Sequence, residues 1–221
     1  MDHPIVLFVV LPLAAYGVGS TPFGYLIARL RGTDIRRAGS GNVGATNVGR
    51  VLGRKWGVLC FVLDVVKGFV PVLIAGRLLV RGDVPALDRQ AAWLAVGCGV
   101  ILGHVFTFYL RFRGGKGVAT SLGVVLGVFP YFTWPGLAAL GLWIAVTLAS
   151  RYVSLGSIVA GTAFVPLFAG FGLALDWPLL QLWPLMVFAA AMAALILLRH
   201  RGNIGRLLAG TENRIGRKRA G

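Results

Sequence analysis

Residues 56–79 read WGVLCFVLDVVKGFVPVLIAGRLL, a long apolar run with only three charged side chains. A helix needs about 20 largely apolar residues to cross the hydrocarbon core of a bilayer, and this run is long enough. The whole chain of 221 residues is 57% hydrophobic and 13% charged, with a mean hydropathy of +0.81. Such a composition excludes an ordinary water-soluble core. The sequence therefore predicts an all-α integral membrane protein.

Six further apolar runs accompany this one. The predicted transmembrane helices lie at residues 4–28, 56–79, 90–110, 117–133, 135–150, 153–175 and 178–198. The fourth and fifth runs are short and share a break from Pro130 to Pro135, which leaves open a five-span alternative with re-entrant segments. Because the loops are too short to fold alone and no internal repeat is evident, residues 1–221 are predicted to form a single transmembrane domain.

Glycine is abundant, at 32 residues. Two pairs have the spacing of small residues that lets transmembrane helices approach closely, namely Gly99 with Gly103 and Gly123 with Gly127.

Charge predicts the orientation of these seven spans. Most of the 22 lysines and arginines fall on one side of the topology, in the segments 29–55 and 111–116, at Arg151, and in the tail from residue 199. The other side holds Arg77, Arg81, Arg89, Asp2, Asp83, Asp88 and Asp176. By the positive-inside rule the N-terminus lies outside and the C-terminus in the cytoplasm. This topology explains the formal charge of +15 without nucleic acid.

The start of the chain lacks a basic segment, since its first basic residue is Arg29. A signal peptide would begin with such a segment, so we expect the first apolar run to be retained as a transmembrane helix.

The most informative polar stretch is RRAGSGNVGATNVGR, residues 36–50. Glycines allow successive backbone N–H groups to point into one concavity, and Arg50 can bind an oxyanion through two parallel hydrogen bonds. Neutral donors come from Ser40, Asn42, Thr46 and Asn47. The stretch predicts a phosphate-binding loop on the cytoplasmic side, with a flexible linker as the alternative.

Two familiar phosphate motifs nearly match this loop. Gly39, Gly41 and Gly44 have the spacing of the dinucleotide fingerprint, but that motif needs a preceding strand. The loop also resembles a P-loop, whose lysine position is occupied by Ala45. Neither motif is therefore predicted.

A second polar stretch, RFRGGKGVATS at residues 111–121, precedes the fourth predicted span. Lys116 lies there among Gly114, Gly115 and Gly117. The N–H groups and dipole at a helix N-terminus favour an anion, and the ammonium adds a full positive charge. We expect a second phosphate-binding element, with a lysine that snorkels to the membrane surface as the alternative.

Two weaker candidates lie near the ends of the last predicted spans. Ser154 begins a span, where helix capping alone would also explain a serine. His200 and Asn203 follow the last apolar run, in a tail that by itself resembles a basic segment held to anionic lipid.

Ionisable residues also occur inside the spans. Asp64 and Lys67 share one helix face, so they are expected to neutralise each other. His104 is interpreted as a packing residue more readily than as a proton relay. Cys60 and Cys98 are expected to be apolar filler.

Conventional catalytic groups are scarce. No histidine is followed five residues later by an aspartate, and the chain holds only seven acids. We therefore predict no metal site and no cofactor, and expect a substrate that arrives already activated. The protein would supply positioning and positive charge.

Taken in order, the motifs resemble a known family. They are Ser40-Gly41-Asn42-x-Gly44-Ala45-Thr46-Asn47, Gly114-Gly115-Lys116-Gly117, Ser154-Leu155, and His200-x-x-Asn203-Ile204-x-Arg206-Leu207 with Gly210 and Glu212. Over nearly the full length the chain is similar to the bacterial acyl-phosphate-dependent glycerol-3-phosphate acyltransferases, the PlsY family.

The resemblance implies transfer of a fatty acyl group from acyl phosphate to the 1-hydroxyl of glycerol 3-phosphate. The products would be lysophosphatidic acid and inorganic phosphate, in the first acylation of phospholipid synthesis. It further implies seven helices in the bacterial cytoplasmic membrane, motifs facing the cytoplasm, contact with membrane lipid, and the enzyme that forms acyl phosphate as a partner.

The resemblance also suggests roles for the motif residues. Lys116 and Arg50 would take the phosphate charges, with Ser40 and Ser154 beside them as catalytic residues. Substrate binding would fall to Gly41, Asn42, Thr46, Asn47, Gly114, Gly115, Gly117, His200 and Asn203.

Two other protein classes compete with an enzyme. An anion or phosphate-ester transporter would also contain binding loops and intramembrane charges, but its site normally lies near the midplane between repeats. A lipid-binding scaffold would account for the basic tail and leave both glycine-rich loops unexplained.

Overall fold

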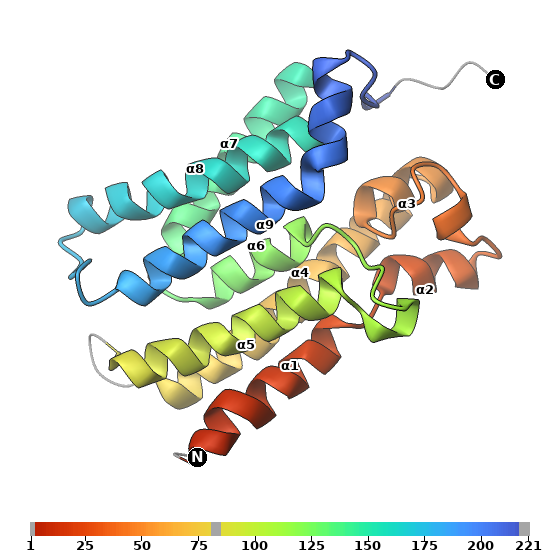
Figure 1. Ribbon diagram of the computed structural model, residues 1–221. Coiled ribbons are helices and arrows are strands. Elements are labelled where there is room, and N and C mark those ends of the chain that lie inside the picture. Colours follow the sequence, from red (N-terminus) through yellow and green to blue (C-terminus); the bar gives the residue numbers. More distant parts are fainter. Residues whose placement is uncertain (1–2, 81–84, 217–221) are drawn as a thin grey trace. The chain divides into compact units, whose positions relative to one another are not determined.

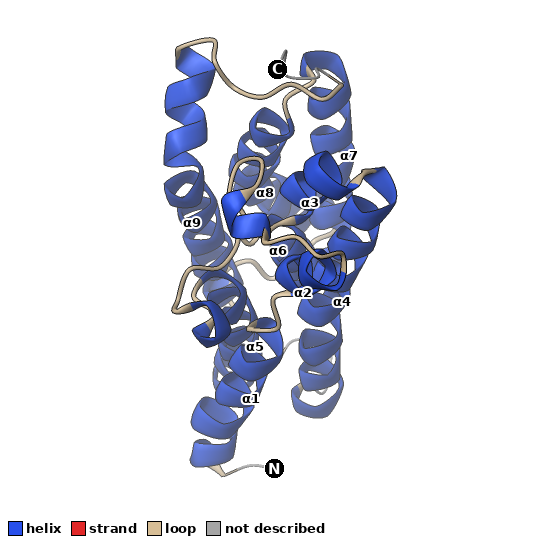
Figure 2. Ribbon diagram, turned by 90° about the vertical axis from the view of Figure 1, so that its right-hand side faces the viewer, coloured by secondary structure: helices blue, strands red, loops and turns tan. Residues whose placement is uncertain are grey.

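The computed structural model describes residues 3–80 and 85–216, and within these ranges the chain forms helices and loops without a strand (Figures 1 and 2). Several charges used to predict the orientation lie outside the described residues, namely Asp2, Arg81, Asp83 and the basic residues after Gly216. The all-helical prediction is confirmed for the described part.

The α-helices are α1 (Leu11–Gly19), α2 (Phe23–Leu30), α3 (Ala45–Leu52), α4 (Arg54–Leu79), α5 (Leu87–Val105), α6 (Val118–Gly127), α7 (Thr133–Ser150), α8 (Val153–Ala174) and α9 (Trp183–Leu208). A π-helical turn η1 (Val6–Val10) precedes α1, and the 3-10 turns η2 (Ile35–Arg37) and η3 (Phe108–Leu110) lie in loops.

Six candidate spans in the described ranges are long and apolar enough to cross a membrane. They are Val6–Leu30, Arg54–Leu79, Leu87–Leu110, Thr133–Ser150, Val153–Ala174 and Trp183–Leu208. The run predicted at 117–133 forms only α6, whose 10 residues extend about 15 Å. That is half of the roughly 30 Å hydrocarbon core, so the structure does not confirm a seventh full-length span.

The first span is interrupted, although the sequence predicts one continuous run at 4–28. Helix α1 ends at Gly19 and α2 begins at Phe23. Pro22 causes the break, because it has no N–H to donate and disfavours a helical conformation at Thr21. The break leaves backbone carbonyls available for side chains from other helices.

The chain forms two compact units, Met1–Pro130 and Tyr131–Gly221. In the first unit α5 runs beside α1, and α4 packs on α6 (Figure 1). Gly99 and Gly103 lie so close to α1 that a Cβ would overlap its backbone, and Gly123 stands in the same relation to α4. A Cβ on Gly127 would also press on α4. Both predicted small-residue pairs are therefore helix contacts.

In the second unit α8 packs against both α7 and α9. Phe132, just before α7, is fully buried. Its ring meets Phe164 and Phe168 edge to face, with ring centroids 5.1 Å apart in each pair. This geometry is favourable between aromatic rings and joins the start of α7 to α8.

Candidate active site

One buried amide organises the first glycine-rich loop. Asn47 is 2% exposed. Its Oδ1 accepts from the Ser40 N–H at 2.8 Å, and its Nδ2 donates to the carbonyl oxygens of Ala38 at 3.0 Å and Asn42 at 2.8 Å. Since both ends of the amide bind backbone groups, Asn47 holds the loop closed from within.

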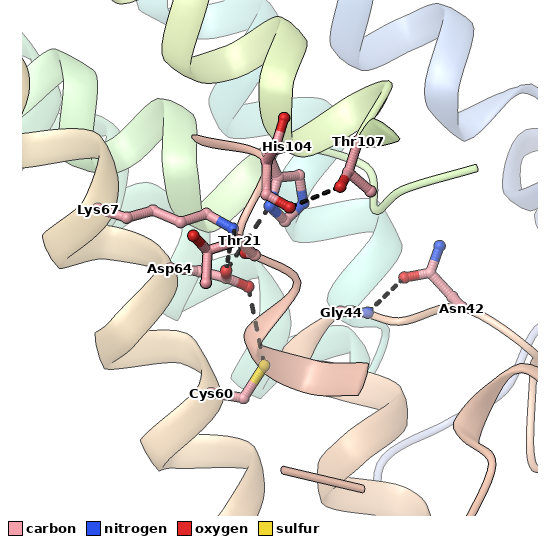
Figure 3. Close-up of polar contacts among 9 residues, drawn as sticks. Thr21, Asn42, Gly44, Cys60, Asp64, Lys67, His104 and Thr107 are labelled. Atoms are coloured by element: carbon pink, nitrogen blue, oxygen red, sulfur yellow. Dashed lines mark hydrogen bonds and ion pairs between the residues drawn. The ribbon is translucent and has the colours of Figure 1, made fainter. Parts of the chain in front are cut away.

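Glycines allow the loop to curl around this amide. Gly39 and Gly41 have φ values of +61° and +72°, in the left-handed region that favours glycine. A Cβ on Gly39 would overlap Oδ1 of Asn47. Asn42 Oδ1 accepts from the Gly44 N–H at 2.8 Å, which fixes the entry to α3 (Figure 3).

An exposed ion pair anchors the start of the loop. Asp34 caps η2, and the Arg36 guanidinium donates to both of its carboxylate oxygens, at 2.9 and 2.7 Å. This hydrogen bonding lowers the pKa of Asp34 from 3.8 to about 2. The charged carboxylate therefore fixes the local geometry of η2.

The loop presents polar side chains at its surface. Ser40, Thr46 and Arg50 are exposed, and Asn42 is partly exposed. The Arg50 guanidinium lies 3.4 Å from Oδ1 of Asn47. The cation is thus tied to the same amide that closes the loop.

The Gly-Gly-Lys-Gly loop lies directly on the end of α5. The N–H of Gly114 donates to the Val105 carbonyl at 3.0 Å, and that of Gly115 donates to the His104 carbonyl at 3.2 Å. A Cβ on Gly114 would overlap this His104 oxygen. Glycine is required here because the loop backbone touches the helix backbone.

Lys116 follows this contact and is partly exposed. Gly117, with φ of +87°, is the N-cap of α6. Lys116 therefore lies just before the N-terminus of α6, as the sequence predicts. The helix dipole at this end favours an anion.

Buried charges lie beneath these loops. Lys67 Nζ lies 2.7 Å from Asp64 Oδ1 and donates to the Thr21 carbonyl at 2.8 Å. His104 Nδ1 is 3.6 Å from Asp64 Oδ1. Figure 3 shows the three side chains converging beside the break between α1 and α2. The predicted Asp64–Lys67 pair is confirmed, and His104 is part of the same cluster.

A small pocket connects the cluster with the first loop. Its cavity volume is about 10 Å³, which is room for about one water molecule. The lining residues are Ser20, Thr21, Pro22, Phe23, Gly24, Val43, Asp64, Lys67, His104 and Thr107. Val43 belongs to the first glycine-rich loop, and His104 carries the second. Val43 also shares a buried hydrophobic cluster with Leu110, just before the second polar stretch, so the two stretches lie near each other in the first unit.

In the second unit two of the predicted residues, Ser154 and Asn203, contact Glu212. Its Oε1 accepts from Asn203 Nδ2 at 2.7 Å and from Ser154 Oγ at 3.1 Å, and its Oε2 accepts from Arg206 Nε at 2.7 Å. His200 is 2% exposed, and its Nδ1 lies 2.8 Å from the Ile196 carbonyl. This acid therefore ties α9 to the start of α8.

Burial raises the pKa of the Glu212 carboxyl, but hydrogen bonds from Asn203, Arg206 and Ser154 outweigh it, so that the pKa lies below the ordinary 4.5. The sequence analysis quoted Glu212 in a motif without giving it a role. A usable signal was present, because it is the single acid beyond Asp176 and stands in a basic tail.

Comparisons with known proteins show the family of this chain. The sequence model of the glycerol-3-phosphate acyltransferase family matches residues 9–210. The chain belongs to the glycerol-3-phosphate acyltransferase family. Glycerol-3-phosphate acyltransferases of Geobacter sulfurreducens and Aquifex aeolicus are 46% and 44% identical to it, each over 207 residues. These matches cover 93% and 92% of this chain and 96% and 97% of the relatives.

Solved structures of a family member are also similar. The glycerol 3-phosphate form of PlsY (YgiH), an integral membrane glycerol 3-phosphate acyltransferase, is 42% identical with a TM-score of 0.80, over 94% of this chain and 95% of that one. Its lysophosphatidic acid form is 41% identical with a TM-score of 0.78 over the same shares. The predicted PlsY family, acyltransferase class and integral membrane character are confirmed.

Proposed function

We propose that this glycerol-3-phosphate acyltransferase takes its acyl group from acyl phosphate and transfers it to the 1-hydroxyl of sn-glycerol 3-phosphate. The new bond joins the glycerol oxygen to the acyl carbon, and the bond that breaks joins that carbon to the phosphate oxygen. The products are 1-acyl-sn-glycerol 3-phosphate and inorganic phosphate, in the first acylation of phospholipid synthesis.

The observation that carries the proposal is that the first unit contains two cationic, glycine-rich stretches, whose neighbouring residues Val43, Val48 and Leu110 share one buried hydrophobic cluster. Both substrates present phosphate oxyanions. Lys116 and Arg50 balance this charge, while the hydroxyls of Ser40 and Thr46 and the amide of Asn42 donate hydrogen bonds. Gly41 and Gly117 allow the positive φ values of the turns, and Gly114 and Gly115 allow the close backbone approach that places the loop. Asn47 contributes by holding its loop closed.

In the second unit we assign Ser154, His200 and Asn203 to the same reaction, with Glu212 holding Ser154 and Asn203 in position. Hydrogen-bonded positioning of this kind is what a transfer between two bound substrates requires. The acyl chain lies along apolar helix surfaces and contributes about 0.8 kcal/mol per buried methylene.

A substrate phosphate is the proposed acceptor of the hydroxyl proton. This follows from the chemistry of the donor, whose leaving phosphate makes the acyl carbon reactive without a strong base. A rate whose pH dependence required an enzymic histidine would contradict this step.

The proposed topology retains seven crossings, with α6 as the short one, in the bacterial cytoplasmic membrane. The basic loops and tail face the cytoplasm, according to the positive-inside rule. An enzyme that forms acyl phosphate then supplies this donor on the cytoplasmic side.

The donor can be tested by supplying an acyl phosphate and an acyl thioester in separate reactions. Purified protein in lipid receives glycerol 3-phosphate with either palmitoyl phosphate or palmitoyl-CoA, and the lipid product is identified by mass spectrometry. We expect lysophosphatidic acid with palmitoyl phosphate alone. Equal rates with palmitoyl-CoA would contradict the assigned donor.

A further inference from the structure

His104, a buried residue of the first unit, has no part in the proposed chemistry. It lies in a cluster with two buried charged residues. Asp64, Lys67 and His104 are 2%, 5% and 8% exposed. Buried charges are costly unless they are paired, and the contact of 2.7 Å between Asp64 and Lys67 already neutralises both. Charge balance therefore does not explain why a histidine lies beside this pair.

The contacts of His104 indicate another role. Its Nδ1 faces Asp64 Oδ1 at 3.6 Å (Figure 3). Its Nε2 lies against Gly115, so closely that a Cβ on Gly115 would overlap it. The His104 carbonyl also accepts the Gly115 N–H at 3.2 Å. The residue before Lys116 is thus held by both the backbone and the ring of His104.

Other contacts fix the backbone on which His104 stands. Thr107 Oγ1 donates to the Ser20 carbonyl, and the Tyr16 hydroxyl donates to the Phe106 carbonyl. Both bonds join the end of α5 to the end of α1. The ring of His104 is therefore presented from a fixed helix end, with a carboxylate on one side and the lysine loop on the other.

We propose that His104 is a positioning residue for Lys116. Asp64 sets the orientation of the imidazole, as a carboxylate beside one ring nitrogen does in other histidine sites, and the imidazole seats Gly115. This inference rests on the proposed role of Lys116 in binding phosphate. In this role the effect of His104 passes through the loop.

A double-mutant cycle tests this coupling. kcat/KM for glycerol 3-phosphate is measured for the wild type, His104→Phe, Lys116→Arg and the double variant. Phenylalanine keeps a ring and removes both nitrogens, and arginine keeps the charge with altered geometry. Because a small misplacement of a binding group can cost about 100-fold, we expect His104→Phe to lose about 10- to 100-fold. In the Lys116→Arg background the same substitution should cost less than about twofold.

Gln90→Met is the matched control. Gln90 is also buried in α5, near its other end, where its Nε2 donates to the Pro85 carbonyl at 2.8 Å. The Gln90→Met variant measures the cost of removing a buried polar group from this helix. Its kcat/KM should stay within about twofold of the wild type. If His104→Phe does not fold, His104→Asn, which keeps a nitrogen near the place of Nδ1, replaces it in the cycle.

The outcomes separate the two claims. Losses that multiply in the double variant, or wild-type kcat/KM in the His104 variant, would overturn the positioning role while leaving the acyltransferase proposal intact. A wild-type protein without turnover would instead remove the proposed function, and this inference with it.

Discussion

Arg50 and Lys116 are the two cations to which we assign the substrate phosphates. Arg50 is tied to Asn47, and Lys116 directly precedes the cap of α6. Removing one preorganised hydrogen-bond donor from an oxyanion site typically costs about 100- to 1,000-fold in kcat. We therefore expect Arg50→Met and Lys116→Met each to lose at least about 100-fold in initial rate. Arg113→Met, in the same loop as Lys116 and exposed, is the matched control and should keep its rate. Near-normal rates in both variants would remove these residues from the site.

Glu212 predicts a pH dependence of stability in the second unit. Its pKa is lowered in the folded state, so its contribution is fully present above the unfolded value of 4.5 and is lost as the pH falls through the folded value. We expect Glu212→Gln to lower the melting temperature at pH 7, because Arg206 loses its partner. The difference from wild type should shrink below pH 4.5. A difference that does not change with pH would show that the carboxylate charge is unimportant.

At the scale of elements, the close contact between the Gly-Gly-Lys-Gly loop and α5 is the most restrictive feature. A Cβ on Gly114 would overlap the His104 carbonyl, a backbone atom that has little freedom to move. We expect Gly114→Ala to cost about 1 to 3 kcal/mol of stability and to reduce kcat/KM.

Gly17→Ala is the control for this substitution. A Cβ on Gly17, in α1 of the same unit, would meet nothing within 4 Å. Alanine there should maintain activity and stabilise the helix by about 0.5 to 1 kcal/mol. Thermal unfolding and steady-state rates of both variants check the pair. Equal stability of Gly114→Ala and wild type would contradict the close contact between this loop and the end of α5.

The sequence predicted the long elements well because hydropathy reports them directly. The runs at 56–79 and 153–175 correspond to α4 and α8 within a few residues. It overestimated the run at 117–133, since apolar composition alone does not reveal that α6 ends at Gly127. The break at Pro22 was also missed, because a proline within an apolar run does not always end a helix. Pro71, for example, lies inside the continuous helix α4.

The candidate site was predictable only in part. Residue types gave the two loops to which we assign phosphate binding, and spacing gave the Asp64–Lys67 pair. The third member, His104, comes from another helix, and its approach to Asp64 depends on tertiary packing that no local pattern contains. For the same reason the sequence did not show that Asn47 faces inward to close its loop.

At the scale of the whole molecule, the proposed orientation can be measured by cysteine labelling. Thr46 is exposed in α3 and Leu87 is 53% exposed at the start of α5, on opposite sides of the span α4. In a Cys98→Ala background, an impermeant maleimide should label Thr46→Cys only in inverted vesicles and Leu87→Cys only in right-side-out vesicles. The reverse pattern would place the loops to which we assign phosphate binding outside the cell and would contradict a cytoplasmic site.

The most direct test of the account is the initial rate of lysophosphatidic acid formation by the purified wild-type protein in lipid, given palmitoyl phosphate and glycerol 3-phosphate. We predict lysophosphatidic acid and inorganic phosphate in equal amounts, with no added metal or cofactor. Folded protein that forms no lysophosphatidic acid, or that releases phosphate without it, would contradict acyl transfer at the two cationic loops.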